Sequence, residues 1–534
     1  MLYLTSPFSI PADKANDHEY VTNRLYRLLR ARRKDLLSYS LYKRSIDARN
    51  KNDVHFVCSY VVDCSSPPQN AVPYEPPLNV FDNVTKVASD DRVIVVGAGP
   101  AGLFAALYLA KSGLSVTVIE RGSDVVKRRQ AVDGYFNGGR FNEQTNVQFG
   151  LGGAGTFSDG KLTSNLSATS FGRSVFEQFV KCGAPNEILF NSLPHIGTDK
   201  LQQVVANLRD EIISCGGKFL FETKVTDLIV KNGLVTGVVT EHNGKTSSLP
   251  AEHVILACGH SARDTFKMLY DNGADMQFKP FAVGLRIEHP REFINTAQYG
   301  KLFASHRDLG AASYKLTYKC LDGHGCYSFC MCPGGVVVAA NSEYDTVVVN
   351  GMSDFARNSA NSNSALVVTV SRADVERYGY GSGVFAGLRF QQYLERKAYE
   401  LGGGNYSAPC QNASDFVENR ISSGFVTAPS YPRGVKPRNL RELLPKDLGD
   451  NLAEGLVAFE RKIKGFLTFG TLTGVETRTS SPIKILRGDD FQSNLKRLYP
   501  AGEGAGYSGG IVSSAVDGLK VAAAIINNAR VFPI

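Results

Sequence analysis

Two cysteines that could exchange electrons, Cys330 and Cys332, stand two residues apart in the 534-residue chain. Residues at i and i+2 of a strand point to the same side, so the two thiols could form a redox-active dithiol. Cys320, His324 and Cys326 lie just upstream, and thiolate and imidazole are the ligands that zinc prefers. The segment has no CxxC pair, so we expect no metal. A structural role is the third hypothesis, because free cysteines are often buried small hydrophobes.

A glycine-rich loop and a later arginine supply further groups that could act on a bound molecule. Ser158, Asp159 and Lys161 carry polar side chains in the loop 152–161. Lys161 could place a cation beside an anionic reduced cofactor, and an exposed loop lysine is the alternative. Arg478 could bind a substrate carboxylate or phosphate through two parallel hydrogen bonds. We predict four catalytic residues, Cys330, Cys332, Lys161 and Arg478.

Many amides and hydroxyls near strand-like segments indicate a polar pocket floor, and structural hydrogen bonding explains them equally well. They are Asn350, Ser353, Arg357, Asn361, Asn363, Ser364, Glu476, Thr479 and Ser481. His260, directly after Ala-Cys-Gly, could donate a proton, and a plain turn residue is the simpler interpretation.

These groups need a scaffold, and a glycine fingerprint at 97–102 supplies its first part. The fingerprint lies between a buried strand at 93–96 and a helix that begins near Leu103. Gly97 permits a tight turn, Gly99 lets a pyrophosphate approach the backbone, and Gly102 allows close packing of helix on strand. The helix N-terminus attracts phosphates. A second strand, 115–119, ends in Glu120, which is placed to accept a ribose hydroxyl. The spacing predicts a bound dinucleotide.

Two later segments indicate which dinucleotide is bound. A buried strand at 254–258 ends at Gly259. The segment 498–511 begins as a strand and continues through a glycine-rich turn into a helix that runs to Asn527. The turn offers a second helix N-terminus to a flavin or its phosphates. Together with the fingerprint, these segments resemble the large two-dinucleotide-fold FAD flavoproteins. We therefore expect FAD.

Four longer strings narrow the resemblance, at 146–163, 328–335, 350–353 and 476–482. They are similar to a family of uncharacterised FAD-dependent dehydrogenases within the glutathione-reductase-related flavoproteins. The resemblance covers nearly the whole chain. It implies an α/β fold, with a Rossmann-like FAD-binding domain, an inserted α+β substrate domain and a small N-terminal α/β domain. It also implies an oxidoreductase that passes a hydride or two electrons through non-covalently bound FAD to or from a small polar substrate.

The predicted cofactor contacts combine the fingerprint with this resemblance. Glu503 stands where the superfamily has an acid that bonds a ribityl hydroxyl, and Gly334 and Gly335 could let the backbone approach a ligand. The predicted cofactor-binding residues are Gly97, Ala98, Gly99, Pro100, Ala101, Gly102, Glu120, Arg121, Gly122, Gly153, Thr156, Ser158, Asp159, Lys161, Val225, Ala257, Gly259, Gly502, Glu503, Gly509, Gly510 and Ile511.

No second GxGxxG follows a strand, so the sequence contains no dedicated nicotinamide domain. NAD(P)H could visit the flavin transiently, and a protein donor such as a ferredoxin or thiol carrier is equally possible. Three alternatives stay open. One is an isoprenoid-type double-bond reductase, whose apolar cavity the Asn- and Ser-rich segments argue against. The others are a flavin-containing RNA-interacting protein and a redox sensor without turnover.

Charge is concentrated in one segment. The chain has 59 Lys and Arg against 51 Asp and Glu, a net charge of +8. Residues 24–51 hold ten of the former and two of the latter, so the remainder is neutral. The segment could dock an acidic partner, a nucleic acid or anionic lipid. Its tyrosines Tyr26, Tyr39 and Tyr42 look like residues of a solvated helix face, so nucleic acid is the less favoured partner.

Composition bounds the remaining possibilities. A hydrophobic content of 43% is ordinary for a globular protein, and no apolar run is long enough to span a membrane. Ten cysteines in so long a chain indicate a reducing, cytoplasmic environment, with an organelle transit peptide as the alternative.

The sequence patterns divide the chain into four parts. Residues 1–63 form the N-terminal domain, with a basic helix over 20–34 and a strand over 54–62, and 64–89 form a proline-rich linker. Residues 90–279 and 490–534 form a discontinuous FAD-binding domain, which contains a hairpin at 225–240 with its turn at Asn232-Gly233. Residues 280–489 form the inserted domain.

Overall fold

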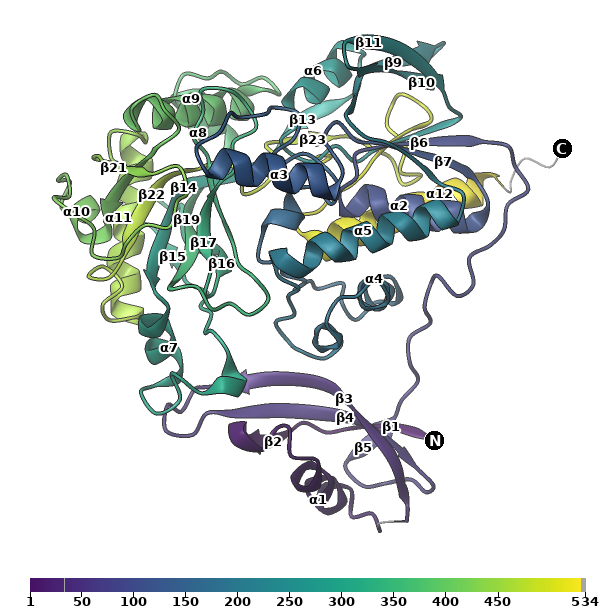
Figure 1. Cartoon of the computed structure of the whole chain (residues 1–534), viewed down its shortest axis with the longest axis vertical. Coiled ribbons are helices and arrows are strands. Elements are labelled where there is room, and N and C mark those ends of the chain that lie inside the picture. Colours follow the sequence, from purple (N-terminus) through teal and green to yellow (C-terminus); the bar gives the residue numbers. More distant parts are fainter. Residues whose placement is uncertain (33, 530–534) are drawn as a thin grey trace.

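A parallel sheet assembled from distant parts of the chain lies at the centre of the molecule (Figure 1). The computed structural model describes residues 1–32 and 34–529. In order across the sheet, the five strands are β24 (Leu498–Pro500), β12 (His253–Leu256), β6 (Arg92–Val96), β7 (Ser115–Ile119) and β8 (Lys218–Leu220). The pairing of β24 with β12 brings the last part of the chain beside the first glycine turn. This is the Rossmann-like, mixed α/β arrangement that the sequence indicates.

Both faces of this sheet are covered, which explains why β6 is apolar throughout its buried residues. On one face pack α2 (Pro100–Ser112), α5 (Thr198–Ser214) and α12 (Ile511–Ala529). The other face packs against the antiparallel strands β9 (Thr223–Lys231), β10 (Leu234–His242) and β11 (Lys245–Pro250) and against α6 (Arg263–Asp271). The hairpin turn between β9 and β10 is confirmed, with positive φ at Asn232 and Gly233.

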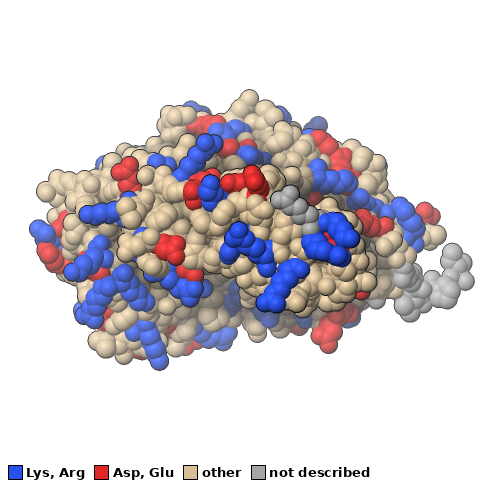
Figure 2. All heavy atoms as spheres, turned by 90° about the horizontal axis from the view of Figure 1, so that it is seen from below, with Lys and Arg blue, Asp and Glu red and all other residues tan. Residues whose placement is uncertain are grey.

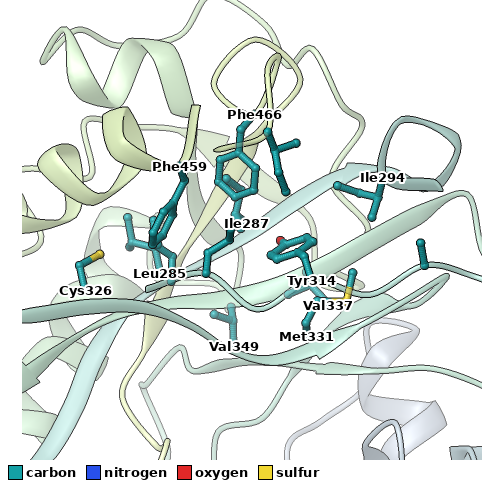
Figure 3. Close-up of a cluster of buried hydrophobic side chains, with 14 of the residues drawn as sticks. Leu285, Ile287, Ile294, Tyr314, Cys326, Met331, Val337, Val349, Phe459 and Phe466 are labelled. Carbon is teal, nitrogen blue, oxygen red and sulfur yellow. The ribbon is translucent and has the colours of Figure 1, made fainter. Parts of the chain in front are cut away.

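A seven-stranded sheet forms the framework of the inserted domain. Its strands, in order, are β15 (Thr317–Lys319), β16 (Gly325–Cys332), β19 (Asn361–Val370), β14 (Phe281–Pro290), β22 (Thr471–Glu476), β20 (Ala408–Asn412) and β21 (Val435–Pro437). Its core, shown in Figure 3, joins Leu285 and Ile287 of β14 to Phe459 and Phe466. The chain enters and leaves the inserted domain side by side, because β13 (Met276–Phe278) pairs with β23 (Ile483–Ile485).

Shorter elements complete these two regions. Between β7 and β8 lie α3 (Val125–Phe136), η2 (Ala154–Phe157), α4 (Ser170–Lys181) and η3 (Asn186–Leu189). The inserted region also contains α7 (Arg291–Tyr299), η4 (Arg307–Leu309), β17 (Val336–Ala339), β18 (Val349–Met352), α8 (Arg372–Arg377), α9 (Ala386–Leu401), α10 (Ala413–Val417) and α11 (Lys446–Lys462). Within the described part of the chain, no helix combines the length and apolar character needed to cross a membrane.

The N-terminal region is a five-stranded antiparallel sheet with a helix packed on it. Its elements are β1 (Leu2–Thr5), β2 (Phe8–Pro11), η1 (Ala12–Lys14), α1 (His18–Leu29), β3 (Leu36–Asp47), β4 (His55–Cys64) and β5 (Ala71–Pro73). Two expectations are corrected here. The helix ends at Leu29, so Tyr39 and Tyr42 lie on strand β3 and not on a helix face. The predicted linker contains β5, which pairs with β1.

Two basic residues of the segment 24–51 contact the rest of the molecule, and two others pair within the segment. Figure 2 shows the Lys and Arg side chains on the molecule as seen from below. Arg44 lies between the rings of Phe56 and Phe190 and donates to Asn191. Lys51 donates to the Gln298 carbonyl. Arg32 and Arg49 pair with Asp35 and Asp47, respectively. Arg33 lies outside the described residues. Part of the local positive charge therefore has structural partners.

Gly102 and Gly134 offer a matched test of the fingerprint. A Cβ at Gly102 would lie 2.0 Å from the Gly97 carbonyl oxygen, whereas one at Gly134, in α3, would meet nothing within 4 Å. We expect Gly102→Ala to destabilise the protein by about 1–3 kcal/mol through overpacking. Gly134→Ala should be neutral or stabilise it by up to about 1 kcal/mol, since alanine is the better helix former. Unfolding midpoints in denaturant measure both, and equal midpoints would contradict the predicted packing constraint.

Candidate functional site

A cavity of about 370 Å³ lies at the carboxyl ends of β6, β7, β12 and β24, where open α/β sheets bind ligands. Most of the predicted cofactor-binding residues line it: Gly97, Gly99, Pro100, Ala101, Glu120, Arg121, Gly153, Ser158, Asp159, Lys161, Val225, Ala257, Gly259, Gly502, Glu503, Gly509, Gly510 and Ile511. Phe329, Cys330 and Asn350 from the inserted domain line the same cavity, with Glu476, Arg478 and Thr479. The cavity therefore lies between the two regions.

Four of the predicted cofactor-binding residues lie behind the cavity wall. Ala98 and Gly122 donate their backbone N–H groups to Glu120. Gly102 packs against the Gly97 carbonyl, and Thr156 lines a small separate cavity beneath the glycine-rich loop. Their part in cofactor binding stays a prediction. Their positions serve the backbone geometry of the turns.

Glu120 joins two turns of the site through its carboxylate. Its oxygens accept hydrogen bonds from the N–H groups of Ala98, Gly122 and Gly150, each at 2.9 Å. Gly97, with φ at +105°, allows the turn to pass close to β12, because a Cβ there would lie 2.3 Å from the Ala257 carbonyl oxygen. Glu120 thereby holds the glycine fingerprint against the glycine-rich loop. Its contact with a ribose stays a prediction.

Arg128, which the sequence analysis missed, organises the glycine-rich loop from behind. Its buried guanidinium donates to the carbonyls of residues 146, 147, 150, 151 and 153. Burial lowers the pKa of Arg128 to about 10. A Cβ at Gly150 would lie 2.3 Å from the Arg128 side chain, so this arginine and the loop glycine require each other. In the sequence, Arg128 is one of several charged residues in a helix and carries no special signal.

Asp159 and Lys161 form the part of the loop that faces the inserted domain. Asp159 is 1% exposed and accepts bonds from Arg357 and Ser353, and it lies 3.0 Å from the Lys161 ammonium. Burial opposes ionisation of Asp159, but Lys161 and Arg357 hold its pKa well below its usual range. Burial would likewise lower the pKa of Lys161, and the Asp159 carboxylate raises it instead. Both groups are therefore charged at neutral pH.

Arg286, also missed, is fully buried at the centre of the inserted-domain side. It donates to both oxygens of Glu476 at 2.8 Å, to Asn363 at 2.7 Å and to the Cys330 carbonyl at 2.7 Å. Its Nη2 lies 3.6 Å from the Cys332 sulfur. Burial disfavours its charge, but Glu476 raises the pKa of Arg286 above the ordinary arginine value. Nothing near Arg286 in the sequence marks it.

The cysteine pair lies at a β-bulge. β16 pairs with β19 at Phe329 and then at Cys332, opposite Ala365 and Asn363, so β16 carries one extra residue. Cys330 has φ at +44° and lines the cavity, whereas Cys332 is buried behind it. Regular strand alternation, on which the pair was predicted, is therefore broken. The two residues still contact each other, because the Cys332 thiol donates to the Cys330 carbonyl at 3.3 Å.

The other cysteines of this segment have separate surroundings. Cys326 packs in the inserted-domain core of Figure 3, and Cys320 donates to the Asn451 carbonyl. His324 lies between Asp322 and Asp374. Among the described residues, no group of three or more His, Cys, Asp or Glu side chains is arranged to hold a metal ion.

Arg478, which we predict to bind a substrate, lines the cavity but pairs with a carboxylate of the protein. Its Nε and Nη2 donate to the two oxygens of buried Glu395, at 3.1 and 2.9 Å, and its Nη1 donates to Ser261 and Ser342. Arg263 binds the same carboxylate. Because the planar fork of Arg478 is occupied by Glu395, the expected two-bond clasp of a substrate is not available.

Of the residues predicted for a polar pocket floor, Asn350, Glu476 and Thr479 line the cavity, and several others bond within the protein. Of the polar residues predicted after Asn350, Ser353 bonds Asp159, Asn363 bonds Arg286, and Ser364 bonds backbone carbonyls. Gly334 and Gly335 allow close approach of the segment 352–357 rather than of a ligand. The polar residues of these segments therefore serve partly the cavity lining and partly the internal hydrogen bonding of the protein.

Glu503 and His260 face the cavity from the cofactor side. Burial raises the pKa of Glu503 to about 7, although Lys279 opposes the shift. Burial lowers the pKa of His260 to about 4, with Arg478 and Arg263 adding to the effect, so the imidazole is neutral at pH 7. The Gly502 N–H donates to Asp517 of α12, which fixes the turn that carries Glu503.

Comparisons with known proteins agree with this arrangement. A family model described as pyridine nucleotide-disulphide oxidoreductase matches residues 91–279, and one described as FAD-dependent protein, C-terminal domain-like, matches 280–479. A domain of unknown function matches residues 5–63. An uncharacterised protein of Clostridium beijerinckii is 44% identical over 525 residues, which cover 96% of each chain.

Solved structures of low sequence identity also match. They include the flavin-dependent brominase Bmp2, at 13% identity over 83% of this chain and 80% of that chain, with a TM-score of 0.39. A geranylgeranyl bacteriochlorophyll reductase-like protein of Thermoplasma acidophilum matches at 13% over 83% and 80%, with a TM-score of 0.36. L-proline dehydrogenase from P. horikoshii matches at 14% over 82% and 94%, with a TM-score of 0.34.

The pKa of Glu503 predicts a pH-dependent stability. Between its ordinary value of 4.5 and about 7, the folded protein keeps a proton that the unfolded chain has lost. Stability of the flavin-free protein should therefore fall as pH rises through this window. Glu503→Gln should lose less stability over this window. Between its low-pH and high-pH ends, the free energy of unfolding of the variant should rise by roughly 1–3 kcal/mol relative to that of the parent. Urea unfolding across this range measures it.

The exposed Glu442 provides the control, since Glu442→Gln should leave the pH dependence unchanged. If Glu503→Gln has the same pH profile as the parent protein, Glu503 does not carry the raised pKa.

Proposed function

This chain belongs to a family of FAD-dependent oxidoreductases, and we propose that it passes a hydride or an electron pair between non-covalently bound FAD and a small polar substrate. The observation that carries the proposal is the composition of one cavity. Its cofactor side is made of the two glycine-rich turns, and its other side carries Lys161, Glu476 and Cys330. A substrate would enter between the FAD-binding and inserted regions.

The residues of the cofactor side fit a dinucleotide. α2 and α12 both begin at the cavity wall, at Gly99-Pro100 and at Gly510-Ile511. The first N–H groups of a helix lack intrahelical partners and attract phosphate oxygens. No described side chain caps α2, and a Cβ on Gly99 would project into open space, with the nearest atom 4.0 Å away. This leaves room for a pyrophosphate at the backbone.

FAD supplies the electron-transfer chemistry when bound, and the chain binds, orients and tunes it. Glu503 is suited to hold or release a proton near neutral pH. Lys161 keeps a positive charge in the cavity, which favours an anionic substrate or a reduced, anionic cofactor. The position of Lys161 is fixed by its ion pair with Asp159, which Arg357 in turn holds through a second ion pair.

We propose that the electron donor comes from solution. Because the sequence has no second nucleotide fingerprint after a strand, NAD(P)H would bind transiently over the flavin and leave before the substrate enters. A protein donor remains the alternative. The charged side chains that line the cavity favour a small polar substrate over an isoprenoid.

Gly99→Val tests the cofactor site. Gly99 has φ −79° and ψ −178°, an extended conformation that valine adopts readily, so the flavin-free protein should keep its unfolding midpoint within about 1 kcal/mol. The branched side chain fills the space at the start of α2, and FAD affinity should fall at least ~100-fold, a loss of about 3 kcal/mol. Equilibrium titration with FAD, followed by flavin fluorescence, measures the affinity. Gly134→Ala is the control and should bind FAD normally.

Reduction of the loaded protein tests the reaction. Anaerobic addition of NADPH, and separately NADH, should bleach the flavin absorbance band at a stoichiometric amount of donor. A band that bleaches only with dithionite would exclude the nicotinamide donor and favour a protein donor. Protein that binds no FAD, even after reconstitution, would refute the proposed function.

A further inference from the structure

We propose that Cys330 and Cys332 form a redox-active dithiol that exchanges electrons between FAD and a thiol or disulfide substrate, with Cys330 as the sulfur that reacts with the substrate. The inference deepens the proposed function and rests on it, because FAD is the partner of the pair. The proposed redox site lies at the β-bulge of β16 in the inserted domain. None of the comparisons assigns a site to this bulge.

The bulge brings the two sulfurs together. A regular strand would separate residues i and i+2 by a full pleat repeat, but here Cys330 takes a left-handed φ of +44° and leaves the β16–β19 ladder. Bulges often redirect a side chain beside an active site. As a result, the Cys332 thiol donates to the Cys330 carbonyl at 3.3 Å, the two cysteine side chains influence each other's ionisation, and neither is in a disulfide.

The pair is asymmetric in exposure. Cys330 is half-buried and lines the cavity, whereas Cys332 is 0% exposed. A substrate in the cavity can therefore reach only the Cys330 sulfur. Cys332 lies behind it, positioned to form the intramolecular bond.

Positive charge surrounds the pair. The Lys161 ammonium lies 3.9 Å and an Arg286 nitrogen 3.6 Å from the Cys332 sulfur. The hydrogen bond from Cys332 is the main cause that lowers the pKa of Cys330 to about 5, with Lys161 and Arg286 outweighing burial. The same contact and burial raise the pKa of Cys332 well above its ordinary value. The pair therefore holds one proton at neutral pH, with Cys330 as the thiolate, which is the nucleophilic form.

Other cysteines lack these features. Burial raises the pKa of Cys258, which also lines the cavity, to about 12. Cys326, in the core, and Cys410, bonded to Thr473, have raised pKa values for the same reason. Cys330 is thus distinguished by its cationic surroundings and its partner sulfur, not by exposure alone.

The pair also lies close to the cofactor side. The charge of Cys330 contributes to the raised pKa of Glu503, which stands in the turn before α12. Both residues line the same cavity.

The proposed step balances without a further reactant. Oxidation of the pair forms one sulfur–sulfur bond and releases two electrons and one proton, the proton coming from the Cys332 thiol. Oxidised FAD accepts all three. A substrate thiolate then attacks the disulfide at Cys330, and Cys332 leaves as a thiolate that takes up the proton of a second substrate thiol. That second thiol, now ionised, releases Cys330 as a thiolate and forms the substrate disulfide. With a reduced donor the same steps run in reverse and reduce a disulfide.

Reductive titration counts the electrons that the pair stores. The FAD-loaded protein, first oxidised with glutathione disulfide and freed of it, should take up two electron pairs per flavin from dithionite under anaerobic conditions. Cys330→Ser and Cys332→Ser should each take up one. Cys215→Ser, a change at a half-buried cysteine that ends α5, is the matched control and should behave as the parent.

Two measurements on the protein itself accompany the titration. Mass spectrometry of the oxidised parent should find the peptide that contains both cysteines lighter by two hydrogens. At about pH 6, iodoacetamide should modify Cys330 of the reduced protein at least about tenfold faster than Cys258, because the pKa of Cys330 is lowered and that of Cys258 is raised. This preference should shrink in Cys332→Ala, which removes the neighbouring thiol.

The outcomes separate this inference from the proposed function. A bound flavin that NADPH bleaches, together with one electron pair taken up and no disulfide in the peptide, would overturn the dithiol alone. Absence of FAD binding would overturn both. Two electron pairs in the parent and one in each cysteine variant would support both.

Discussion

The buried guanidinium of Arg286 connects five strands beside the cavity. From β14 it reaches Glu476 of β22, Asn363 of β19, the Cys330 carbonyl and Cys332 sulfur of β16, and, at 3.4 Å, Asn350 of β18. A buried ion pair of this kind adds little net stability, because desolvation offsets its Coulomb attraction. The ion pair instead fixes the relative position of the strands that it joins. Removing either partner would leave an uncompensated buried charge, so the strands are held in the one register that satisfies both.

The charges next to Arg286 continue across the boundary between the two regions. Lys161 and Asp159 come from the glycine-rich loop of the FAD-binding region, and Arg357 and Ser353 come from the inserted region. A cation from each region therefore flanks the sulfur of Cys332. The electrostatic state of the cysteine pair depends on how the two regions meet, and so does any substrate position beside it.

The sequence predicts those parts of the site that depend on residues close together in the chain, and misses those that depend on residues far apart. The cofactor side depends on backbone features that are local: Gly97 with its positive φ, the strand before it, and Glu120 at the end of the next strand. Such features appear in the sequence as a fixed spacing of glycines, strand and acidic residue. The other side depends on partners far apart in the chain. Arg478 and Glu395 are 83 residues apart, and Arg286 and Glu476 are 190 residues apart. No spacing rule indicates that Arg478 is already occupied, or that a bulge displaces Cys330.

The small N-terminal region bears on the same geometry. Arg44 of β3 pairs with Asn191 in the FAD-binding region, while Lys51 contacts Gln298 and Gly300 at the end of α7 in the inserted region. One rigid sheet therefore touches both regions, on the far side of the molecule from the paired crossing strands β13 and β23 (Figure 1). Held at both ends, the two regions have little freedom to swing apart as bodies. Substrate access to Cys330 would then depend on side chains and loops at the cavity mouth, which favours small ligands over large ones.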